Sequence, residues 1–334
     1  MTYALRRILM TAPLLLAVSL VVFLLMDALP GDPAVKRFGE HAVSPEEMKR
    51  WRDERGLDDP VLVRWGKYMG GVVGSLDFGK SYVNDREVGG ALFTKLQVTM
   101  ELSICALLIA LFIGGSVGIL SAVFRRTPID YGGNLLALGG ISMPVFWLGM
   151  LLWILVADVF GFAYRSGRPE VEGFTTDMYL FEAMFRMRWD VFTEHLSRLF
   201  LPAITLSTIP MAVITRMTRA AMLEELGQDY ARTASAKGLT RRAVVLKHVL
   251  RNALIPITTI TGLQFGTLLG GAVLTETVFS WPGLGLFIVE EGVRGSDTPI
   301  IAGGILMVST IFVFINLGVD LLYGVIDPRI RRAS

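Results

Sequence analysis

Cysteine and charge are both scarce in this sequence. Cys105 is the only cysteine among 334 residues and lies within an apolar run, so an intramolecular disulfide is excluded and nothing favours a thiolate metal site. Asp, Glu, Lys and Arg make up 19% of the residues, whereas a soluble protein usually carries about a quarter. The net charge is only +2 and gives no indication of a nucleic-acid partner.

Apolar residues are abundant and gathered into long runs. They make up 52% of the chain, and the mean hydropathy is +0.54. A bilayer is crossed by roughly 20 apolar residues in a helix. We therefore expect six membrane spans, at about residues 8–26, 102–124, 134–157, 199–215, 253–275 and 298–319.

Two of these spans need comment. The fourth is short and interrupted by Pro202 and Pro210. The first resembles a signal peptide, because Arg6 and Arg7 precede its apolar core. No small-x-small cleavage site follows it, so we interpret it as a retained helix.

The distribution of Lys and Arg predicts the orientation. With the N-terminus inside, the inner segments 1–7, 125–131, 216–252 and 325–334 hold 15 basic residues, and the short outer segments 161–198 and 277–297 hold 6. Short cytoplasmic loops carry the excess of basic residues. We expect a multi-pass protein of the cytoplasmic membrane with both termini inside.

The segment GSLDFGKS, Gly74 to Ser81, matches the phosphate-binding P-loop pattern. A working P-loop needs a strand before the glycine-rich turn and a helix after it. The preceding residues are too few and too rich in glycine for a buried strand, and the predicted orientation places the segment outside, where ATP is absent. We interpret the match as accidental.

The loop between the first two spans has helical signals instead. Ser44 and Glu47 form a capping box with Pro45 at the first helical position, and Gly56 offers a stop. A second short amphipathic helix is expected over residues 61–73. Together they predict a small helical cap.

The segment from Arg219 to Pro256 is too polar to cross a membrane, and its apolar residues are too regularly spaced for a disordered tail. Helix formers run to Lys237, Gly238 breaks the run, and Thr240 can cap a second helix over residues 241–254. One face of the second helix carries Val244, Val245, His248, Val249 and Asn252. Two short helices joined at a glycine predict a rigid knob, although an interfacial anchor would show the same pattern.

This knob resembles the cytoplasmic loop of the membrane subunits of binding-protein-dependent ABC importers. The family pattern is E-A-A-x-x-x-G, and RTASAKG, Arg232 to Gly238, departs from it at Arg232. That form is typical of the dipeptide and oligopeptide branch. Further segments resemble the same branch: LPGDPA at 29–34, SMPVFWLG at 142–149, LPAITL at 201–206, RNALIP at 251–256, TETVFSWPGLG at 275–285 and DPRIR at 327–331.

The resemblance implies an all-α polytopic membrane protein with the type I ABC importer permease fold, six transmembrane helices and an outer helical loop domain. It divides the chain into an N-terminal helix 1–29, an extracytoplasmic loop domain 30–95, a five-helix core 96–326 that contains the coupling loop 216–254, and a cytoplasmic tail 327–334. The implied function is that of a permease subunit that is not itself an enzyme. Its implied partners are a second homologous permease, two ABC ATPase subunits that hold ATP and magnesium, and an extracytoplasmic substrate-binding protein. No cofactor or metal is expected on this chain.

The resemblance also implies which residues couple the permease to the ATPase. They are Asp229, Tyr230, Arg232, Thr233, Ala234, Ala236, Lys237, Gly238, Leu239 and Arg241. Lys237 and Arg241 are expected to pair with acidic groups on the ATPase, and a solvated inner face explains these charges equally well.

The translocation path is predicted from polar residues in apolar surroundings. Gln264, Glu276 and Asn316 lie in or beside the last two spans, where polar groups normally face a bundle interior or a cavity. Helix–helix hydrogen bonds explain Gln264 and Asn316 equally well. The segment 279–285 is expected to form either a re-entrant turn or a tryptophan anchor at the interface.

Three functions from different classes remain open. The first is an importer permease for dipeptides or oligopeptides, with nickel chelates, glutathione or oligosaccharides as alternative substrates. The second is a secondary transporter, whose usual internal repeats and ionisable groups at mid-bilayer are not seen here. The third is a membrane-anchored ATPase built on Gly74 to Ser81, which a Lys80→Ala variant with retained transport and ATPase activity would leave without support.

Overall fold

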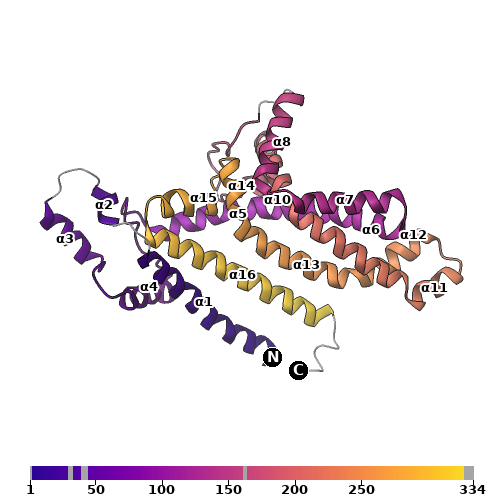
Figure 1. The fold of residues 1–334 in the computed structure, drawn as a ribbon, viewed down its shortest axis with the longest axis horizontal. Helices are drawn as coiled ribbons and strands as arrows, with labels where there is room; N and C mark the ends of the chain where they lie inside the picture. Colours follow the sequence, from indigo (N-terminus) through magenta and orange to yellow (C-terminus); the bar gives the residue numbers. More distant parts are fainter. Residues whose placement is uncertain (1, 29–32, 39–43, 161–163, 327–334) are drawn as a thin grey trace. The chain divides into compact units, whose positions relative to one another are not determined.

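The chain folds almost entirely into helices in a computed structural model (Figure 1). The structure describes residues 2–28, 33–38, 44–160 and 164–326, and it describes no side chains for residues 2–11, 36, 160 and 320–326. Within those ranges the only β pairing is an isolated bridge between Lys80 and Glu87. The predicted all-α class is therefore confirmed. The segments LPGDPA and DPRIR lie wholly or partly outside the described residues.

The long helices account for the predicted spans. Four are long and apolar enough to cross a membrane: Val88–Val123, Trp189–Leu226, Arg241–Gly271 and Thr298–Val319. A bent pair of helices supplies a fifth candidate, over 128–159. The first predicted span lies in α1 (Thr2–Ala28). The part of α1 whose side chains are described, Ala12–Ala28, is apolar but shorter than the four long helices.

Two compact units can be distinguished in the fold. Unit 1 comprises residues 1–99, 173–178 and 282–313, and unit 2 comprises residues 100–172, 179–281 and 314–334. The helices α5 (Val88–Ile109) and α16 (Thr298–Ile326) contribute residues to both.

Unit 1 begins with α1, α2 (Pro33–Phe38), α3 (Pro45–Glu54) and α4 (Val61–Ser75). It also contains α15 (Leu284–Phe287) and the π-helical turn Ile288–Val293. Phe23 of α1 packs with Ile301 and Ala302 of α16 and with Tyr68 of α4. The Trp65 indole donates to the Ser19 hydroxyl at 3.0 Å and so fixes α4 to α1.

The caps of α3 form as the sequence predicts. Ser44 precedes the helix, and its hydroxyl accepts a hydrogen bond from the Glu47 backbone N–H at 3.2 Å. The helix ends at Glu54, and Gly56 has a φ of +58°, which suits the predicted stop. The second predicted helix, over 61–73, is α4.

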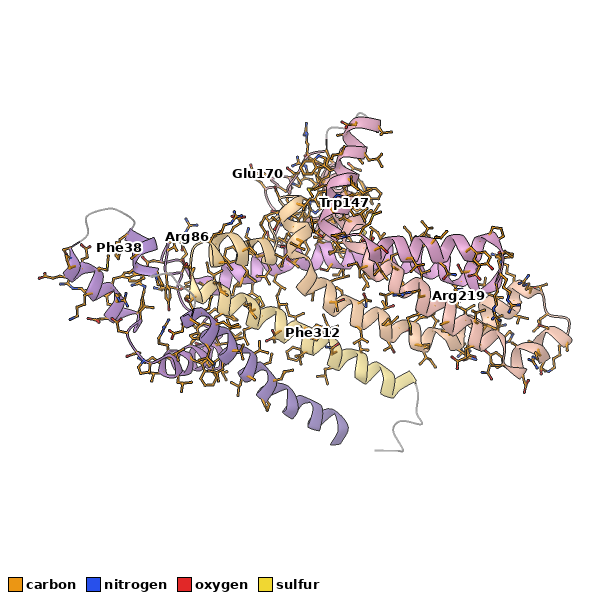
Figure 2. All side chains as sticks on the ribbon, viewed as in Figure 1. Phe38, Arg86, Trp147, Glu170, Arg219 and Phe312 are labelled. Atoms are coloured by element: carbon orange, nitrogen blue, oxygen red, sulfur yellow. The ribbon has the colours of Figure 1, made fainter. Side chains whose placement is uncertain are left out.

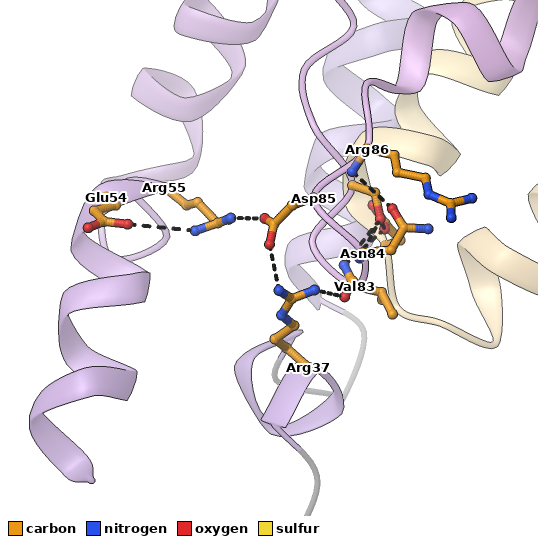
Figure 3. Close-up of polar contacts among 9 residues, drawn as sticks. Arg37, Glu54, Arg55, Val83, Asn84, Asp85 and Arg86 are labelled. Carbon is orange, nitrogen blue, oxygen red and sulfur yellow. Dashed lines mark hydrogen bonds and ion pairs between the residues drawn. The ribbon is translucent and has the colours of Figure 1, made fainter. Parts of the chain in front are cut away.

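Ion pairs connect these short helices to the following loop (Figure 3). The Asp85 carboxylate pairs with Arg37 of α2 at 2.5 Å and with Arg55 at the end of α3. The Arg55 guanidinium also lies 4.4 Å from the centre of the Trp51 ring. These contacts join α2, α3 and the loop 76–87 into one small layer.

The segment Gly74–Ser81 does not have the surroundings of a P-loop. A helix, α4, leads into it in place of a strand, and the residues that follow form a tight hairpin in place of a helix. The Ser81 N–H donates to the Arg86 carbonyl, and the Val88 N–H donates to the Gly79 carbonyl. The Ser81 hydroxyl is buried and donates to Asp297 Oδ2 at 2.5 Å. This serine therefore holds the loop to the residue that precedes α16.

Unit 2 is built around α10 (Trp189–Leu226), which packs against α6 (Gly115–Val123), α7 (Pro128–Ser142), α9 (Tyr179–Phe185) and α13 (Leu250–Gly271). The fourth predicted span lies within this helix of 38 residues, which continues through Pro202 and Pro210. A proline leaves the carbonyl four residues earlier without its helical donor. The Tyr164 hydroxyl supplies a donor at 2.7 Å for Arg198, the residue four before Pro202.

The third predicted span is wrong as a single helix. The chain forms α7 and α8 (Val145–Phe160), which meet at an angle of 109°. Pro144 lies at the break, and Met143 before it is extended, with φ −103° and ψ 134°. A proline disfavours helical geometry in the residue before it, which explains the bend. An apolar run without charge was not sufficient to predict continuity.

Candidate functional site

The knob comprises residues 227–249 and follows the end of α10. It contains α11 (Asp229–Ala236), a turn at Gly238, α12 (Arg241–Ala243) and the π-helical turn Val244–Val249. The Thr240 hydroxyl accepts a hydrogen bond from the Ala243 N–H at 3.3 Å and caps the second helix, as the sequence predicts. The helical hairpin therefore forms where the sequence places it.

One face of the knob is packed into a small core. Ala231 and Ala234 of α11 meet Val244, Val245 and Val249. The same cluster includes residues of the neighbouring helices: Ala122, Ala221, Met222, Ala253 and Ile257. Fully burying one valine contributes on the order of 1.5–3 kcal/mol, so three of them hold the hairpin firmly. The knob is a rigid extension of α10 and α13.

The opposite face is exposed. Nine of the ten residues predicted to form the coupling site are exposed, and only Ala234 is buried. Asp229 and Arg232 approach to 3.8 Å, but their side chains are 97% and 74% exposed, so this pair contributes little. Leu239 presents an apolar side chain that is 43% exposed. This face is available for contact with another molecule.

Gly238 lies in the tight turn between α11 and α12. Its φ is +82°, a region that glycine adopts without strain. A Cβ at this position would meet no atom within 4 Å. The predicted turn is confirmed, and the space beside Gly238 is open rather than filled by this chain.

The two predicted cationic contacts differ. Lys237 forms no ion pair within the described residues and is exposed. Arg241 donates a hydrogen bond to the Val123 carbonyl, and its guanidinium lies 5.7 Å from the Phe124 ring. Arg241 therefore has a role within this chain, in fixing the knob to the end of α6.

A buried ion pair lies near the base of the knob. Arg219 of α10, labelled in Figure 2, binds Asp130 of α7 through two hydrogen bonds of 2.7 and 2.9 Å. Asp130 also accepts from the Arg126 N–H at 3.0 Å and from the Asn134 side chain at 3.1 Å. Two bonds between a guanidinium and a carboxylate fix relative orientation as well as distance.

Tyr230 shows a further internal contact that the sequence did not predict. Its hydroxyl donates to Glu225 at 2.6 Å. Partial burial, followed by this hydrogen bond, raises the pKa of the Tyr230 phenol. The contact joins the first turn of α11 to the last turn of α10.

The three residues predicted for the translocation path have different surroundings. Gln264 is half-buried in α13, Glu276 is fully buried in α14 (Val273–Val278), and the Asn316 side-chain oxygen is buried without a hydrogen-bond partner among the described residues. Their role in a path stays a prediction.

Phe279 and Trp281 follow α14 and are both fully buried. The Phe279 ring stacks on the Trp153 ring with centroids 6.0 Å apart. The ring centroids of Trp281 and His195 are 5.5 Å apart. The burial of Trp281 within unit 2 does not fit an exposed interfacial anchor. A buried turn explains this segment better.

Sequence reasoning missed a polar network in unit 2. Glu101 and His195 are both fully buried, and Glu101 Oε2 lies 2.8 Å from His195 Nε2. The other carboxylate oxygen accepts from the Leu180 N–H at 2.6 Å. These residues are 94 and 79 positions apart in sequence, so no local pattern joins them. The available signal was an acid and a histidine at the edges of two apolar runs.

Comparison with known proteins agrees with this architecture. The pattern of the family described as "Binding-protein-dependent transport system inner membrane component" matches residues 114–332, and that of its N-terminal part matches residues 1–103. The dipeptide transport system permease protein DppB of Alkalihalophilus pseudofirmus is 43% identical over 334 residues, with 99% of each chain covered. DppB of Escherichia coli strain K12 is 42% identical over 335 residues, with 98% of each chain covered.

A solved structure shares the fold. A chain of the MetNI methionine ABC transporter, in an inward-facing conformation, aligns with a TM-score of 0.55 over 71% of this chain and 97% of its own length, at 17% identity. At that identity the likeness concerns the fold alone. The helical architecture and the near full-length sequence matches together show that this chain belongs to the family of binding-protein-dependent transport system inner membrane components.

Proposed function

We propose that this chain is a permease subunit of an ATP-driven importer that carries dipeptides or oligopeptides across the cytoplasmic membrane. The support for a peptide substrate is the identity of 42–43% with permeases named for dipeptide transport, over nearly the whole chain. The support for a transport role without catalysis is the same family membership. The chain moves its substrate by a change of shape and makes no covalent bond.

The knob is the part of the chain that receives the driving force. We place it on the cytoplasmic side, together with both termini, because the segments on that side hold more Lys and Arg. Its exposed face docks on an ABC ATPase subunit, where ATP and magnesium bind. The other partners are a second permease, a second ATPase subunit and an extracytoplasmic binding protein that delivers the peptide.

The observation that carries this assignment is the division of the knob into two faces. The inner face packs Ala231 and Ala234 against three buried valines. Because this packing is tight, a displacement of α11 moves α10 and α13 with it. The outer face leaves Arg232, Lys237 and Gly238 uncovered. A loop that served only as an interfacial anchor would gain nothing from an open glycine turn at its tip.

Uptake by intact cells tests the substrate. Cells with and without the gene are given a labelled dipeptide and, separately, a labelled pentapeptide. We expect deletion to abolish uptake of at least one of them and the restored gene to recover it. The preferred length then follows from which peptide is affected.

Unchanged uptake of both peptides would contradict the peptide assignment. The same cells would then be tested with a nickel chelate, glutathione and an oligosaccharide, which are the alternative substrates. Dependence of any uptake on the ATPase subunits distinguishes an importer permease from a secondary transporter.

A further inference from the structure

A cavity of about 390 Å³ lies in unit 1 between residues of α1, α4 and α16, and we call it the polar cavity after the charged side chains in its lining. Phe23 of α1, Tyr68 of α4 and Pro299 of α16 line it. Its charged lining consists of four cations and one carboxylate: Arg55, Arg64, Lys67, Lys80 and Glu54. The cavity wall is therefore predominantly positive and suited to an anionic group.

Three of the four cations already have carboxylate partners. Arg64 lies 3.0 Å from Asp27, Lys67 lies 2.6 Å from Asp59, and Arg55 pairs with Asp85 and, at 4.0 Å, with Glu54. The Arg64 and Arg55 side chains are only 16% and 20% exposed, whereas Lys67 is 68% exposed, so only the Lys67 pair is a weak surface contact.

Lys80 differs from these three cations because it forms no ion pair within the described residues and is exposed. The Tyr68 hydroxyl is buried and has no hydrogen-bond partner in the described part of the chain. Lys80 and Tyr68 both line this cavity, and the polar group of each has no partner in the described part of the chain.

A second cavity of about 530 Å³ lies in the same unit, and it is apolar. Leu16 of α1, Val72 of α4, Leu96 of α5 and Leu306 of α16 are among its lining residues. At the end of α4, Val73 and Leu76 line it as well and are 77% and 65% exposed. Exposed apolar side chains around an apolar groove indicate that something apolar covers it.

The two cavities follow one another along the same helices. Phe23 lines the polar cavity and Leu16 the apolar one, seven positions apart on α1. Pro299 and Leu306 are also seven positions apart on α16. At 1.5 Å per residue, each pair spans roughly 10 Å. One leaflet of the hydrocarbon core is about 15 Å thick, so this offset suits a headgroup above its own acyl chain.

We propose that these two cavities form a binding site for one phospholipid with a negatively charged headgroup. The headgroup phosphate binds Lys80, with Arg64 and the Tyr68 hydroxyl beside it. One acyl chain fills the groove between α1, α4 and α16. Charge at one end and an apolar groove at the other match a lipid better than a protein helix, which would present a continuous apolar face.

Native mass spectrometry of the assembled transporter tests this proposal. The complex is reconstituted in vesicles of equal parts phosphatidylcholine and phosphatidylglycerol, released, and weighed with its retained lipids. We expect the wild-type complex to retain phosphatidylglycerol in preference to phosphatidylcholine. Loss of one charge-assisted contact in Lys80→Gln should weaken that retention about tenfold.

Matched variants separate binding from folding. Lys49→Gln removes an exposed lysine of α3 that lines neither cavity, and it should retain lipid like the wild type. Lys80→Arg keeps the charge and should restore retention. Leu16→Trp fills the groove and should expel the lipid, whereas Leu14→Trp changes an exposed leucine outside the groove and should not.

Three results would overturn the proposal. Equal retention of the two lipids by the wild type would show that the site does not prefer an anionic headgroup. A wild-type complex without retained lipid would mean that protein covers the groove. Free glycerol phosphate that binds the wild type and Leu16→Trp equally well would identify a soluble anion as the ligand, with no part for the groove.

Discussion

Two turns of this chain contain a glycine next to a lysine, and they serve opposite purposes. Gly79 and Gly238 have φ values of +76° and +82°, and a Cβ at either would meet no atom within 4 Å. After Gly79 and Lys80, the chain turns back on itself, and the buried Ser81 hydroxyl bonds Asp297. Around Gly238 the residues from Ser235 to Arg242 are all exposed.

The difference shows that a residue pattern becomes a site only through the atoms that the fold leaves unused. Gly74–Ser81 fits a phosphate-binding pattern at every fixed position, yet its serine is bonded within the chain. Arg232–Gly238 departs from the family pattern at Arg232, yet its outward face is open. Variants at the two turns test this distinction.

The largest effect is expected at the tip of the knob. Asp tolerates a left-handed φ better than most residues, and the space at Gly238 is open, so Gly238→Asp should fold and reach the membrane. A carboxylate at the docking face should nevertheless uncouple ATP hydrolysis from uptake. Peptide uptake should fall about tenfold or more, which is the usual effect of losing one hot-spot contact. Uptake and ATPase activity of the purified complex measure this.

Gly173→Asp is the matched control for this variant. Gly173 has a φ of +80° and equally open space, but it lies outside the knob. It should keep normal uptake. If Gly238→Asp also shows normal uptake, the knob is not the surface that docks on the ATPase.

The base of the knob should show the largest effect on stability. Asp130→Asn leaves the half-buried Arg219 guanidinium without its carboxylate, which typically costs about 3–5 kcal/mol for a buried pair and somewhat less here because Arg219 is 26% exposed. The midpoint of thermal unfolding of the purified protein should fall clearly.

The exposed pair of Arg188 and Asp190, at 3.0 Å, provides the comparison for this variant. Asp190→Asn should leave the free energy of unfolding almost unchanged, because both side chains of this pair are solvent-exposed. Equal shifts in the two variants would mean that burial does not set the strength of the Asp130 pair.

Local signals predicted the helical parts of both regions well. Ser44, Thr240 and Gly238 act through hydrogen bonds or φ values of their immediate neighbours, and the structure places caps or a turn at each. The spacing of apolar residues predicted the packed face of the second helix, whereas the residues of the exposed face were implied by the family resemblance. These features depend on few residues that are close in sequence, so the sequence contains them.

Features that depend on distant partners were missed. The bend at Pro144 is a local feature that was missed as well: the proline disfavours helical geometry at Met143 and interrupts the apolar run. The pairs Glu101 with His195 and Arg219 with Asp130 join residues about 90 positions apart, and nothing local predicts them. Arg241 was expected either to pair with an external partner or to lie on a solvated face, and its hydrogen bond to the Val123 carbonyl of this chain was not predicted. A single sequence carries no record of such pairings.

A smaller effect is expected in the hairpin after Lys80. Ser81→Ala removes the hydroxyl that donates to Asp297 and accepts from the Val83 N–H at 3.2 Å. Loss of one partner of a buried hydrogen bond costs about 1–3 kcal/mol. Hydrogen exchange of residues 79–88 should accelerate accordingly, while ATP hydrolysis by the complex stays unchanged.

Ser75→Ala, at an exposed serine of α4, is the control and should leave the exchange rates unchanged. A loss of ATPase activity in Ser81→Ala would instead support the nucleotide-binding interpretation of Gly74–Ser81.

The smallest effect concerns the pH dependence of the same hairpin. Burial raises the pKa of the Asp297 carboxyl, against the lowering effect of hydrogen bonds from Ser81 and the backbone N–H groups. A carboxyl whose folded pKa is raised stabilises the fold most below its ordinary pKa of about 3.9, and the contribution is lost as pH rises through the raised value. Protection of residues 79–88 from exchange, corrected for intrinsic rates, should therefore decrease from acid to neutral pH. Asp297→Asn should flatten that profile, and protection that increases with pH in the wild type would show that the ionised carboxylate is the stabilising form.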